Sequence, residues 1–366
     1  MAHQIDCPSC GASVTVKRGQ YSAVCSYCGN SVIIPGEHME SSHQQTVQSS
    51  GAGCGRGVAL VAGLAGLLVV GGAALVFYLA AASEDQPFKN PITTTFFQGG
   101  VSPELEFGGS GTGRGYFDDP ECIASDGDGN IYVGERESCR VQVFDDAGNF
   151  LRQWSFARPG EYYLSSMSAS CDGTLFMAYD SEVFVHDGET GELLGMLHHP
   201  DGWGFEDVDV SPGDGIAASW YCNRDDLLLY DPEGNMITHV REAVSGVTGD
   251  SELSMIVAAG NAGETYLFGS FNSAVLVYDT GGRFTDRFGN DEMFSMVFDM
   301  DIDPEGRIWV SDFGDLKVFS GAGEFVTTVD PGVSVYGFTI DDDMRLWAIT
   351  ANDTVVMFSI RDMMGE

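Results

Sequence analysis

One pattern recurs six times between residues 130 and 359 of this 366-residue chain. Each copy holds a turn and a β-rich run, a second run that ends in Asp or Ser, and another turn with a third run. The first runs are residues 130–133, 174–177, 216–219, 265–268, 307–310 and 345–348, and the second are 141–145, 183–187, 227–231, 275–279, 316–320 and 355–359. The second runs end 39 to 48 residues apart, so this part of the chain must combine six similar units.

The spacing of the copies predicts the architecture of residues 104–366. A period of roughly 40–45 residues with four short strands per unit is typical of a β-propeller, so six copies predict six blades and a mainly β fold. The sixth copy stops soon after its third run. We therefore expect residues 104–107, just before the first copy, to supply the missing strand and to remove an exposed sheet edge.

Residues 57–83 contain no charged side chain. Twenty-seven residues at about 1.5 Å each reach roughly 40 Å, whereas a hydrocarbon core is about 30 Å thick. More than fifty residues precede this run, and it is longer than the apolar region of a signal peptide. The run is therefore predicted to be a retained membrane-spanning helix rather than a cleaved signal peptide. Its glycines at 63, 66, 71 and 72 leave a helix-to-helix dimer open.

The apolar run divides the charge unevenly. Residues 1–56 hold three basic and three acidic side chains, so the net charge of −37 lies beyond the run. Arg56 adjoins the run on its N-terminal side, and the positive-inside rule then places residues 1–56 in the cytoplasm and the repeats outside the inner cell membrane. An acidic surface repels nucleic acid and attracts basic partners, so no nucleic-acid partner is expected for the repeats.

Two C-x-x-C pairs, Cys7 with Cys10 and Cys25 with Cys28, lie fourteen residues apart. This spacing brings four thiolates within tetrahedral reach of one Zn²⁺, and no further ligand or general base is evident, so we predict a closed, structural zinc site. The alternatives are two disulfides, which are disfavoured in a reducing cytoplasm, and a redox C-x-x-C, for which no thioredoxin-like βαβ pattern surrounds the pairs. The runs 12–16, 21–24 and 31–34 are expected to form short strands. The knuckles CPSCGA and CSYCGN resemble the zinc-ribbon family over about 30 residues.

The remaining segments connect these parts. Residues 37–56 are polar and rich in Gly and Ser, which is linker composition, and residues 84–103 form a short spacer with three prolines. The predicted order is a zinc ribbon at 1–36, a linker at 37–56, a transmembrane helix at 57–83, a spacer at 84–103 and a propeller at 104–366. We thus expect a small zinc ribbon inside the membrane and a six-bladed β-propeller outside it.

The first copy carries a family resemblance. Residues 107–154 contain the elements GRGYF, PECIA, DGDGNIYV and RVQVF. These resemble the elements of the NHL-repeat family, with Cys122 in place of the usual glycine, and the later copies match the family only in outline. The resemblance implies a propeller that presents one rim as a binding surface. In bacteria it implies the extracytoplasmic sensor domain of a membrane protein.

Two predicted innermost strands carry acidic pairs, Asp207 with Asp209 and Asp299 with Asp301. Alternation along a strand directs both carboxylates of a pair into the central channel. Because buried, unpaired carboxylates are costly, we expect either water or a cation such as Ca²⁺ beside them. The turn SDGDGN at 125–130 resembles part of a calcium loop, but it lacks the downstream glutamate and is predicted to be a hairpin turn.

No catalytic residue is assigned to the repeats. They contain no G-x-S-x-G element, and their histidines fall on or near predicted third and fourth strands, away from the axis. These are His186, His198, His199 and His239. The expected function is binding or sensing of a ligand or protein at the propeller rim, with the zinc ribbon contacting a cytoplasmic partner. The alternative is a membrane-tethered hydrolase or lyase that uses a divalent metal in the channel.

Four cysteines lie beyond the membrane run, where disulfides persist: Cys122, Cys139, Cys171 and Cys222. They allow three pairings. Cys122 with Cys139 is the best placed pair because both fall near one rim, and free buried thiols are the alternative. Trp203 and Tyr221 fall in predicted loops. They are candidate anchors for a partner, with core packing as the alternative.

Overall fold

The structure is a computed structural model that describes residues 2–6, 13–17, 22–24, 31–33 and 101–365. Near the N-terminus, β1 (Ala2–Asp6) pairs antiparallel with β2 (Ser13–Lys17), and β3 (Ser22–Val24) pairs with β4 (Ser31–Ile33). The three strands predicted here are confirmed to within one residue at each end, and β1 was not predicted. One C-x-x-C pair falls between the two strands of each hairpin. The cysteines themselves lie outside the described residues, so the zinc site stays a prediction.

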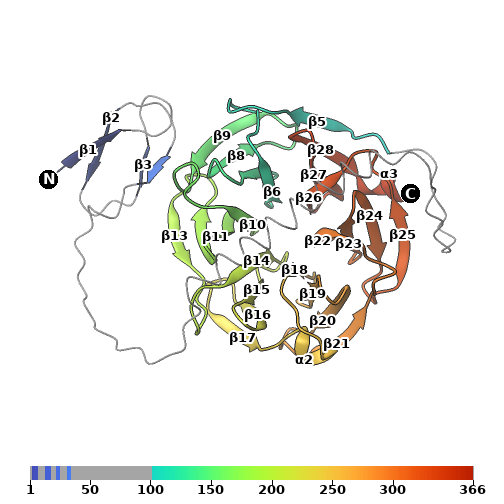
Figure 1. The fold of residues 1–366 in the computed structure, drawn as a ribbon. Helices are drawn as coiled ribbons and strands as arrows, with labels where there is room; N and C mark the ends of the chain where they lie inside the picture. Colours follow the sequence, from blue (N-terminus) through green and yellow to red (C-terminus); the bar gives the residue numbers. More distant parts are fainter. Residues whose placement is uncertain (1, 7–12, 18–21, 25–30, 34–100, 366) are drawn as a thin grey trace, which may run out of the picture. The chain divides into compact units, whose positions relative to one another are not determined.

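Residues 105–359 form six four-stranded antiparallel sheets arranged as blades around a central axis (Figure 1). This confirms the mainly β, six-bladed propeller. The first blade is β6 (Pro120–Ser125), β7 (Ile131–Glu135), β8 (Arg140–Phe144) and β9 (Phe150–Ser155). The second is β10 (Leu164–Ala169), β11 (Thr174–Tyr179), β12 (Glu182–Asp187) and β13 (Leu193–Met196). The third is β14 (Phe205–Val210), β15 (Ile216–Tyr221), β16 (Asp225–Tyr230) and β17 (Met236–Val240).

The remaining blades follow the same order from the axis outward. The fourth is β18 (Met255–Ala259), β19 (Thr265–Gly269), β20 (Ala274–Tyr278) and β21 (Phe284–Phe288). The fifth is β22 (Val297–Ile302), β23 (Ile308–Asp312), β24 (Asp315–Phe319) and β25 (Phe325–Val329). The sixth is β26 (Val335–Ile340), β27 (Arg345–Thr350) and β28 (Thr354–Ser359), completed by β5 (Leu105–Gly108).

Strand β5 closes the ring as the sequence predicts. It pairs antiparallel with β28, with Phe107 opposite Val355, so the two ends of the domain share one blade. Phe107 packs against Phe144 of the first blade, with ring centroids 4.7 Å apart. The closing strand therefore joins the sixth blade to the first through side chains as well as through backbone hydrogen bonds.

Within residues 101–365, the buried apolar side chains form six clusters, and each of them fills one junction between neighbouring blades. The second and third strands of each blade are largely buried on both faces, which explains their apolar runs. Trp309 and Trp347 are fully buried, and their indole N–H groups donate to Asp303 and Asp341 at the blade edges. Stability therefore depends mainly on packing between blades rather than within them.

The turn at 125–130 is a hairpin turn, as predicted. Asp126 Oδ1 accepts the backbone N–H groups of Asp128 and Asn130 at 3.0 and 2.9 Å, and its Oδ2 accepts from the Tyr132 hydroxyl at 2.8 Å. Asp145, Asp303 and Asp341 hold equivalent turns by accepting N–H groups two and four residues ahead. The acidic residue at the head of each turn is thus an internal hydrogen-bond acceptor.

Helices are short where the structure describes the chain. They are α2 (Ser245–Thr248) and α3 (Ile360–Met364). Among the residues described, no helix is both long and apolar enough to cross a bilayer. The predicted spanning run at 57–83 lies outside those residues.

Candidate functional site

The two ends of the propeller differ in the loops they carry. Because neighbouring strands are antiparallel, the connections between blades and those between second and third strands lie at one end, which we call the loop face. It comprises residues 109–119, 136–139, 156–163, 180–181, 197–204, 222–224, 241–254, 270–273, 289–296, 313–314, 330–334 and 351–353. The tight turns headed by aspartate lie at the other end, which we call the turn face.

Large apolar side chains are exposed on the loop face. Phe271 is 64% exposed, Tyr163 58% and Phe313 53%, and Tyr116, Trp203 and Leu253 are exposed as well. The other exposed large apolar residues lie on the outer strands, apart from Phe298 near the start of innermost strand β22. Within the described part of the chain, the turn face exposes none. These six loop-face residues lie in six different connections at one end of the propeller, and exposed aromatic side chains there are candidate anchors for a partner.

Buried carboxylates hold the loops that carry these side chains. Glu252 is 2% exposed and accepts the backbone N–H groups of Leu253 and Ser254 at 2.8 and 3.0 Å. It also accepts the N–H groups of Phe271 and Asn272 from the neighbouring connection. One carboxylate therefore fixes the backbone beneath two exposed apolar residues, Leu253 and Phe271.

Tyr116 lies in a loop that is organised in the same way. Buried Glu135 accepts from Arg140 Nε and Gln142 Nε2, both at 3.0 Å. Gln142 Nε2 also donates to the carbonyl of Tyr116 at 2.7 Å, and Arg140 donates to that of Thr112 at 2.7 Å. Burial raises the pKa of Glu135, although its hydrogen bonds with Arg140 oppose this rise.

The loop with Phe313 follows Asp312, another buried carboxylate. Asp312 Oδ1 accepts the N–H groups of Ser295 and Met296 at 3.0 and 2.6 Å, and Oδ2 is paired with Lys317. Phe313 itself has a positive φ of 53°, a conformation that is costly for a bulky side chain. The fold thus keeps an exposed phenylalanine in a costly backbone conformation.

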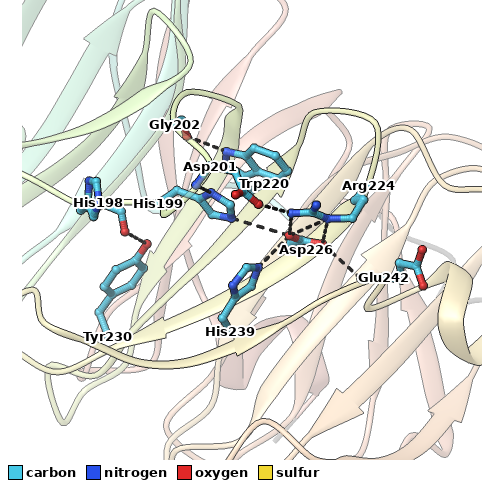
Figure 2. A network of polar contacts seen from close by, with 10 residues as sticks. All are labelled: His198, His199, Asp201, Gly202, Trp220, Arg224, Asp226, Tyr230, His239 and Glu242. Carbon is cyan, nitrogen blue, oxygen red and sulfur yellow. Dashed lines mark hydrogen bonds and ion pairs between the residues drawn. The ribbon is translucent and has the colours of Figure 1, made fainter. Parts of the chain in front are cut away.

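Asp226 is the centre of a polar network that extends to Asp201 and Gly202, the two residues before Trp203 (Figure 2). Its Oδ2 lies 2.7 Å from His239 Nε2, 3.6 Å from His199 Nε2 and 3.0 Å from Arg224 Nη2. Its Oδ1 accepts the backbone N–H of Glu242 at 3.1 Å. Burial alone would raise the pKa of Asp226, but the hydrogen bonds from these neighbours hold that pKa well below its usual value.

The sequence analysis missed this network. It expected the histidines to lie away from the axis, and they do. It did not predict that His199 and His239 converge on the carboxylate of Asp226. A signal was available in the hairpin of β16 and β17. Leu227 pairs with Val240, which puts His239 diagonally across from Asp226 on that hairpin.

The four predicted channel aspartates line the central channel, but their partners were not foreseen. Asp207 and Asp209 accept the backbone N–H groups of Val257 and Ala259 on β18, at 2.7 and 2.8 Å. Asp299 and Asp301 accept in the same way from Phe338 and Ile340 on β26, at 2.8 and 2.7 Å. Each pair thus connects its innermost strand to that of the next blade.

These carboxylates also affect one another. Burial raises the pKa of Asp207 to about 6, and it raises those of Asp299 and Asp301 well above the usual value, with a further rise from facing aspartates. Asp209 and Asp301 reach a polar cavity of about 80 Å³ at the turn-face end of the channel, together with Ser168. The predicted cation, Ca²⁺, would have to compete there with the backbone donors.

Other predicted residues divide between surface and core. Trp203 is exposed on the loop face, whereas Tyr221 packs against the cluster between the third and fourth blades. His186 is buried, with its ring stacked on Trp154 and its Nε2 3.0 Å from the Tyr179 hydroxyl. Burial lowers the pKa of His186 to about 4, so it is a neutral core residue.

The favoured disulfide between Cys122 and Cys139 is wrong, because both residues are free, buried thiols. Cys139 has a positive φ of 53° in its turn, and its thiol lies 3.3 Å from the carbonyl oxygen of Tyr162. Cys122 packs in the same core cluster from strand β6. Both thiols therefore belong to the core between the first and second blades without being bonded to each other.

Comparison with known proteins supports the repeat and the fold. Residues 117–144 match the family model for the NHL repeat. No curated protein matches the chain. Among solved structures, the chain is similar to a chain of the mitotic checkpoint complex, with 12% identity over 76% of this chain and 97% of that one, at a TM-score of 0.51. It is also similar to a gluconolactonase from Xanthomonas campestris, with 13% identity over 66% and 86% of the two chains, at a TM-score of 0.51. At these identities the likeness concerns the fold alone.

Proposed function

We propose that this protein is a membrane-anchored recognition protein whose propeller binds a protein partner through its loop face. The observation that carries the proposal is the group of exposed aromatic side chains on that face, among them Tyr163, Phe271 and Phe313. Buried aromatic residues contribute most of the energy of many protein interfaces. The turn face and its aspartate turns have no comparable group.

The order of the loops supports binding rather than accidental exposure. Glu252 accepts the backbone N–H of exposed Phe271, and Asp312 accepts N–H groups of the 289–296 loop. Glu135 acts indirectly, through Gln142, which donates to the carbonyl of Tyr116. Loops that are already ordered lose less conformational entropy when a partner binds. A monomeric domain that needed only solubility would gain nothing from holding phenylalanine in contact with water.

The charge of the chain indicates the chemistry of the partner. The acidic excess lies beyond residue 56 and gives the chain its net charge of −37. A partner with a basic, apolar surface would associate faster and lose affinity as salt is added. The charge-free run at 57–83 supports attachment to the inner cell membrane, and the two hairpins around the C-x-x-C pairs support a cytoplasmic zinc ribbon.

Site-specific photo-crosslinking tests the proposal in the full chain. A photoreactive amino acid replaces Phe271 or Tyr163 on the loop face, or Ile237 on outer strand β17 as a control of similar exposure, 62%. After irradiation in native membranes, we expect both loop-face positions to give the same crosslinked protein. Equal crosslinking from Ile237, or no product from either loop-face position, would contradict the proposal.

A second candidate is a hydrolase or lyase with a divalent metal in the channel. It is favoured by the gathering of Asp207, Asp209, Asp299 and Asp301 in a fold shared with a gluconolactonase. Metal content of the full chain after dialysis against Ca²⁺ tests it. A stoichiometric ion that is lost in the Asp301→Asn variant would support this candidate, and equal metal content in both proteins would exclude it.

A further inference from the structure

Five of the six innermost strands contain a β-bulge at the same place. The pairing with the second strand of the blade shifts between Pro120 and Cys122 in β6, and equivalent shifts occur in β10, β14, β22 and β26. Each shift takes in the second residue of its strand. These second residues, which we call the collar, are Glu121, Ser165, Glu206, Phe298 and Tyr336. Because innermost strands begin at the loop face, the collar lies at that end of the channel, and β-bulges in such places redirect side chains.

Collar residues of neighbouring blades meet one another. The rings of Phe298 and Tyr336, from the fifth and sixth blades, are in edge-to-face contact with centroids 5.2 Å apart. Gly337 follows Tyr336 and lies against the backbone of the first blade, so closely that a Cβ atom there would be 2.8 Å from the carbonyl oxygen of Glu121. The collar is therefore continuous from the fifth blade through the sixth to the first.

The strands also approach one another across the channel. Cys122, Asp207 and Asp299 each follow directly on a collar residue and come from the first, third and fifth blades. Burial raises the pKa of the Cys122 thiol, and the charges of Asp299 and Asp207 add to that rise. These three groups are thus close together at one level of the channel. The collar residues before them surround its mouth, one position nearer the loop face.

Glu206 is the collar residue with an unpaired acceptor. Its Oε2 atom is buried, and no donor reaches that atom among the residues that the structure describes. The charged groups that affect Glu206, Asp207 and Glu252, are both acidic. Both oxygens of Asp207 and both of Asp299 already accept backbone N–H groups. A buried acceptor without a partner, surrounded by negative charge, favours a positively charged donor.

We propose that the collar binds the ammonium or guanidinium group of a basic side chain that a protein partner inserts into the mouth of the channel. Such a group donates several hydrogen bonds and would supply the donor that Glu206 Oε2 lacks. A cation is also attracted to the face of an aromatic ring, and the Phe298 ring is 36% exposed beside Tyr336. The charges of Asp207 and Asp299 add attraction through space.

The same groups disfavour a bare metal ion at the mouth. Ca²⁺ takes about six to eight oxygen ligands. The collar contains two carboxylates, and that of Glu121 is paired with Arg136 at 3.4 Å. Phe298 offers no ligand atom. An organic cation needs only a ring face and one or two acceptors, which is what the collar provides.

The source of the cation rests on the proposed function, because the basic side chain belongs to the partner that binds the loop face. The collar lies inside the circle of loops that carry Tyr163, Phe271 and Phe313, so a side chain inserted there would be at the centre of the interface, where binding energy concentrates. The affinity of the collar for an ammonium group does not depend on any partner, and a small probe measures it.

Titration of the full chain with n-butylammonium, which has the charged end of a lysine side chain, tests the proposal. Ligand-detected NMR in detergent solution at about 0.15 M salt measures the affinity, and 1-butanol is the uncharged probe. We expect Phe298→Leu and Glu206→Gln each to weaken the binding of n-butylammonium at least about fivefold. Binding of 1-butanol should be at least about tenfold weaker than that of n-butylammonium.

Two matched variants control for attraction to the acidic surface as a whole. Phe284→Leu changes a ring of similar exposure, 37%, on outer strand β21, and Glu233→Gln removes an exposed carboxylate on a turn. Both should bind n-butylammonium as the original chain does. The collar site is refuted if either Phe298→Leu or Glu206→Gln retains the original affinity, if the control variants weaken it equally, or if 1-butanol binds as tightly as n-butylammonium.

Copurification of the partner from native membranes tests the source of the cation. We expect Phe298→Leu to retain at least about fivefold less partner than Phe284→Leu. Full retention of the partner by Phe298→Leu, together with weakened binding of n-butylammonium, would refute the partner as the source. Absence of a crosslink from Phe271 and Tyr163 would instead refute the proposed function and leave the affinity for n-butylammonium as it is.

Discussion

At the scale of single residues, buried carboxylates organise this propeller. The alternation of Asp207 with Asp209 was sufficient to predict that both face the channel. The hydrogen-bond partner of Asp207 was not predictable, because the Val257 N–H is 50 residues away on another blade. A local pattern indicates the direction of a side chain, whereas its partner depends on how the blades assemble. The sequence analysis expected water or a cation beside these carboxylates. It did not consider that backbone N–H groups of the next blade could be their partners.

Glu206 offers a test of burial in the channel wall. Burial raises its pKa to about 8, despite a hydrogen bond from the Met255 backbone and with added repulsion from Asp207, and Oε2 has no hydrogen-bond partner. The contribution of Glu206 to the free energy of unfolding is complete below the pKa of the unfolded chain, near 4.5. It is lost as the pH rises through 8.

We therefore expect Glu206→Gln to gain stability relative to the original chain between pH 5 and 8. The gain should be at least about 1 kcal/mol in the free energy of unfolding, since one pKa unit corresponds to about 1.4 kcal/mol. Chemical unfolding of both proteins at several pH values measures this. If the two proteins differ in free energy of unfolding by the same amount at every pH from 5 to 8, the raised pKa of buried Glu206 is refuted.

Glu252 offers a test of loop order. Replacement by alanine leaves the N–H groups of Leu253, Ser254 and Phe271 without their acceptor, so we expect a loss of more than about 2 kcal/mol of stability. Thermal unfolding and hydrogen exchange of the 270–273 loop measure the effect. The matched control is Glu233→Ala on an exposed turn, which should change little. Equal effects of the two substitutions would refute the anchoring role.

At the scale of elements, the repeat predicted the strands well. The first and second runs of all six copies correspond to strands of the structure, from β7 to β28. Periodicity and turn residues act locally, which explains this agreement. The irregular pairing of the innermost strands was not predictable, and the register shifts between Pro120 and Cys122 and between Val297 and Asp299 are examples. Such β-bulges depend on the twist of a blade rather than on a sequence period.

The closing strand leads to a prediction at this scale. Phe107 on β5 packs against Phe144 of the first blade, so Phe107→Ala should weaken the closure of the ring. We expect a loss of about 2 kcal/mol or more and a greater tendency to aggregate, because β28 would become an exposed edge more often. Thermal unfolding with light scattering measures both effects. The control, Leu194→Ala on exposed strand β13, should leave them unchanged, and a comparable loss in the control would contradict the role of β5.

At the scale of the whole molecule, the two ends of the propeller carry different groups. Core packing joins each blade to the next, the turn face carries aspartate turns, and the loop face carries exposed aromatic residues on anchored loops. The sequence analysis expected one rim to bind and singled out Trp203, but it did not single out Phe271 or Phe313. Exposure depends on how the loops fold over one another, and no spacing of residues encodes it. The zinc ribbon and the membrane helix stay predictions.

The central claim is that the loop face is the surface that recognises a partner. The most direct measurement compares full-length proteins purified from native membranes and quantifies the partner that copurifies with each. A loop-face variant with Tyr163→Ser, Phe271→Ser and Phe313→Ser is compared with an outer-strand variant with Leu194→Ser and Ile237→Ser. The account predicts that the loop-face variant loses at least about 90% of the partner, as expected for more than 1.4 kcal/mol of binding energy, and that the outer-strand variant retains it. Equal retention by both folded variants, or loss only from the outer-strand variant, would contradict the claim.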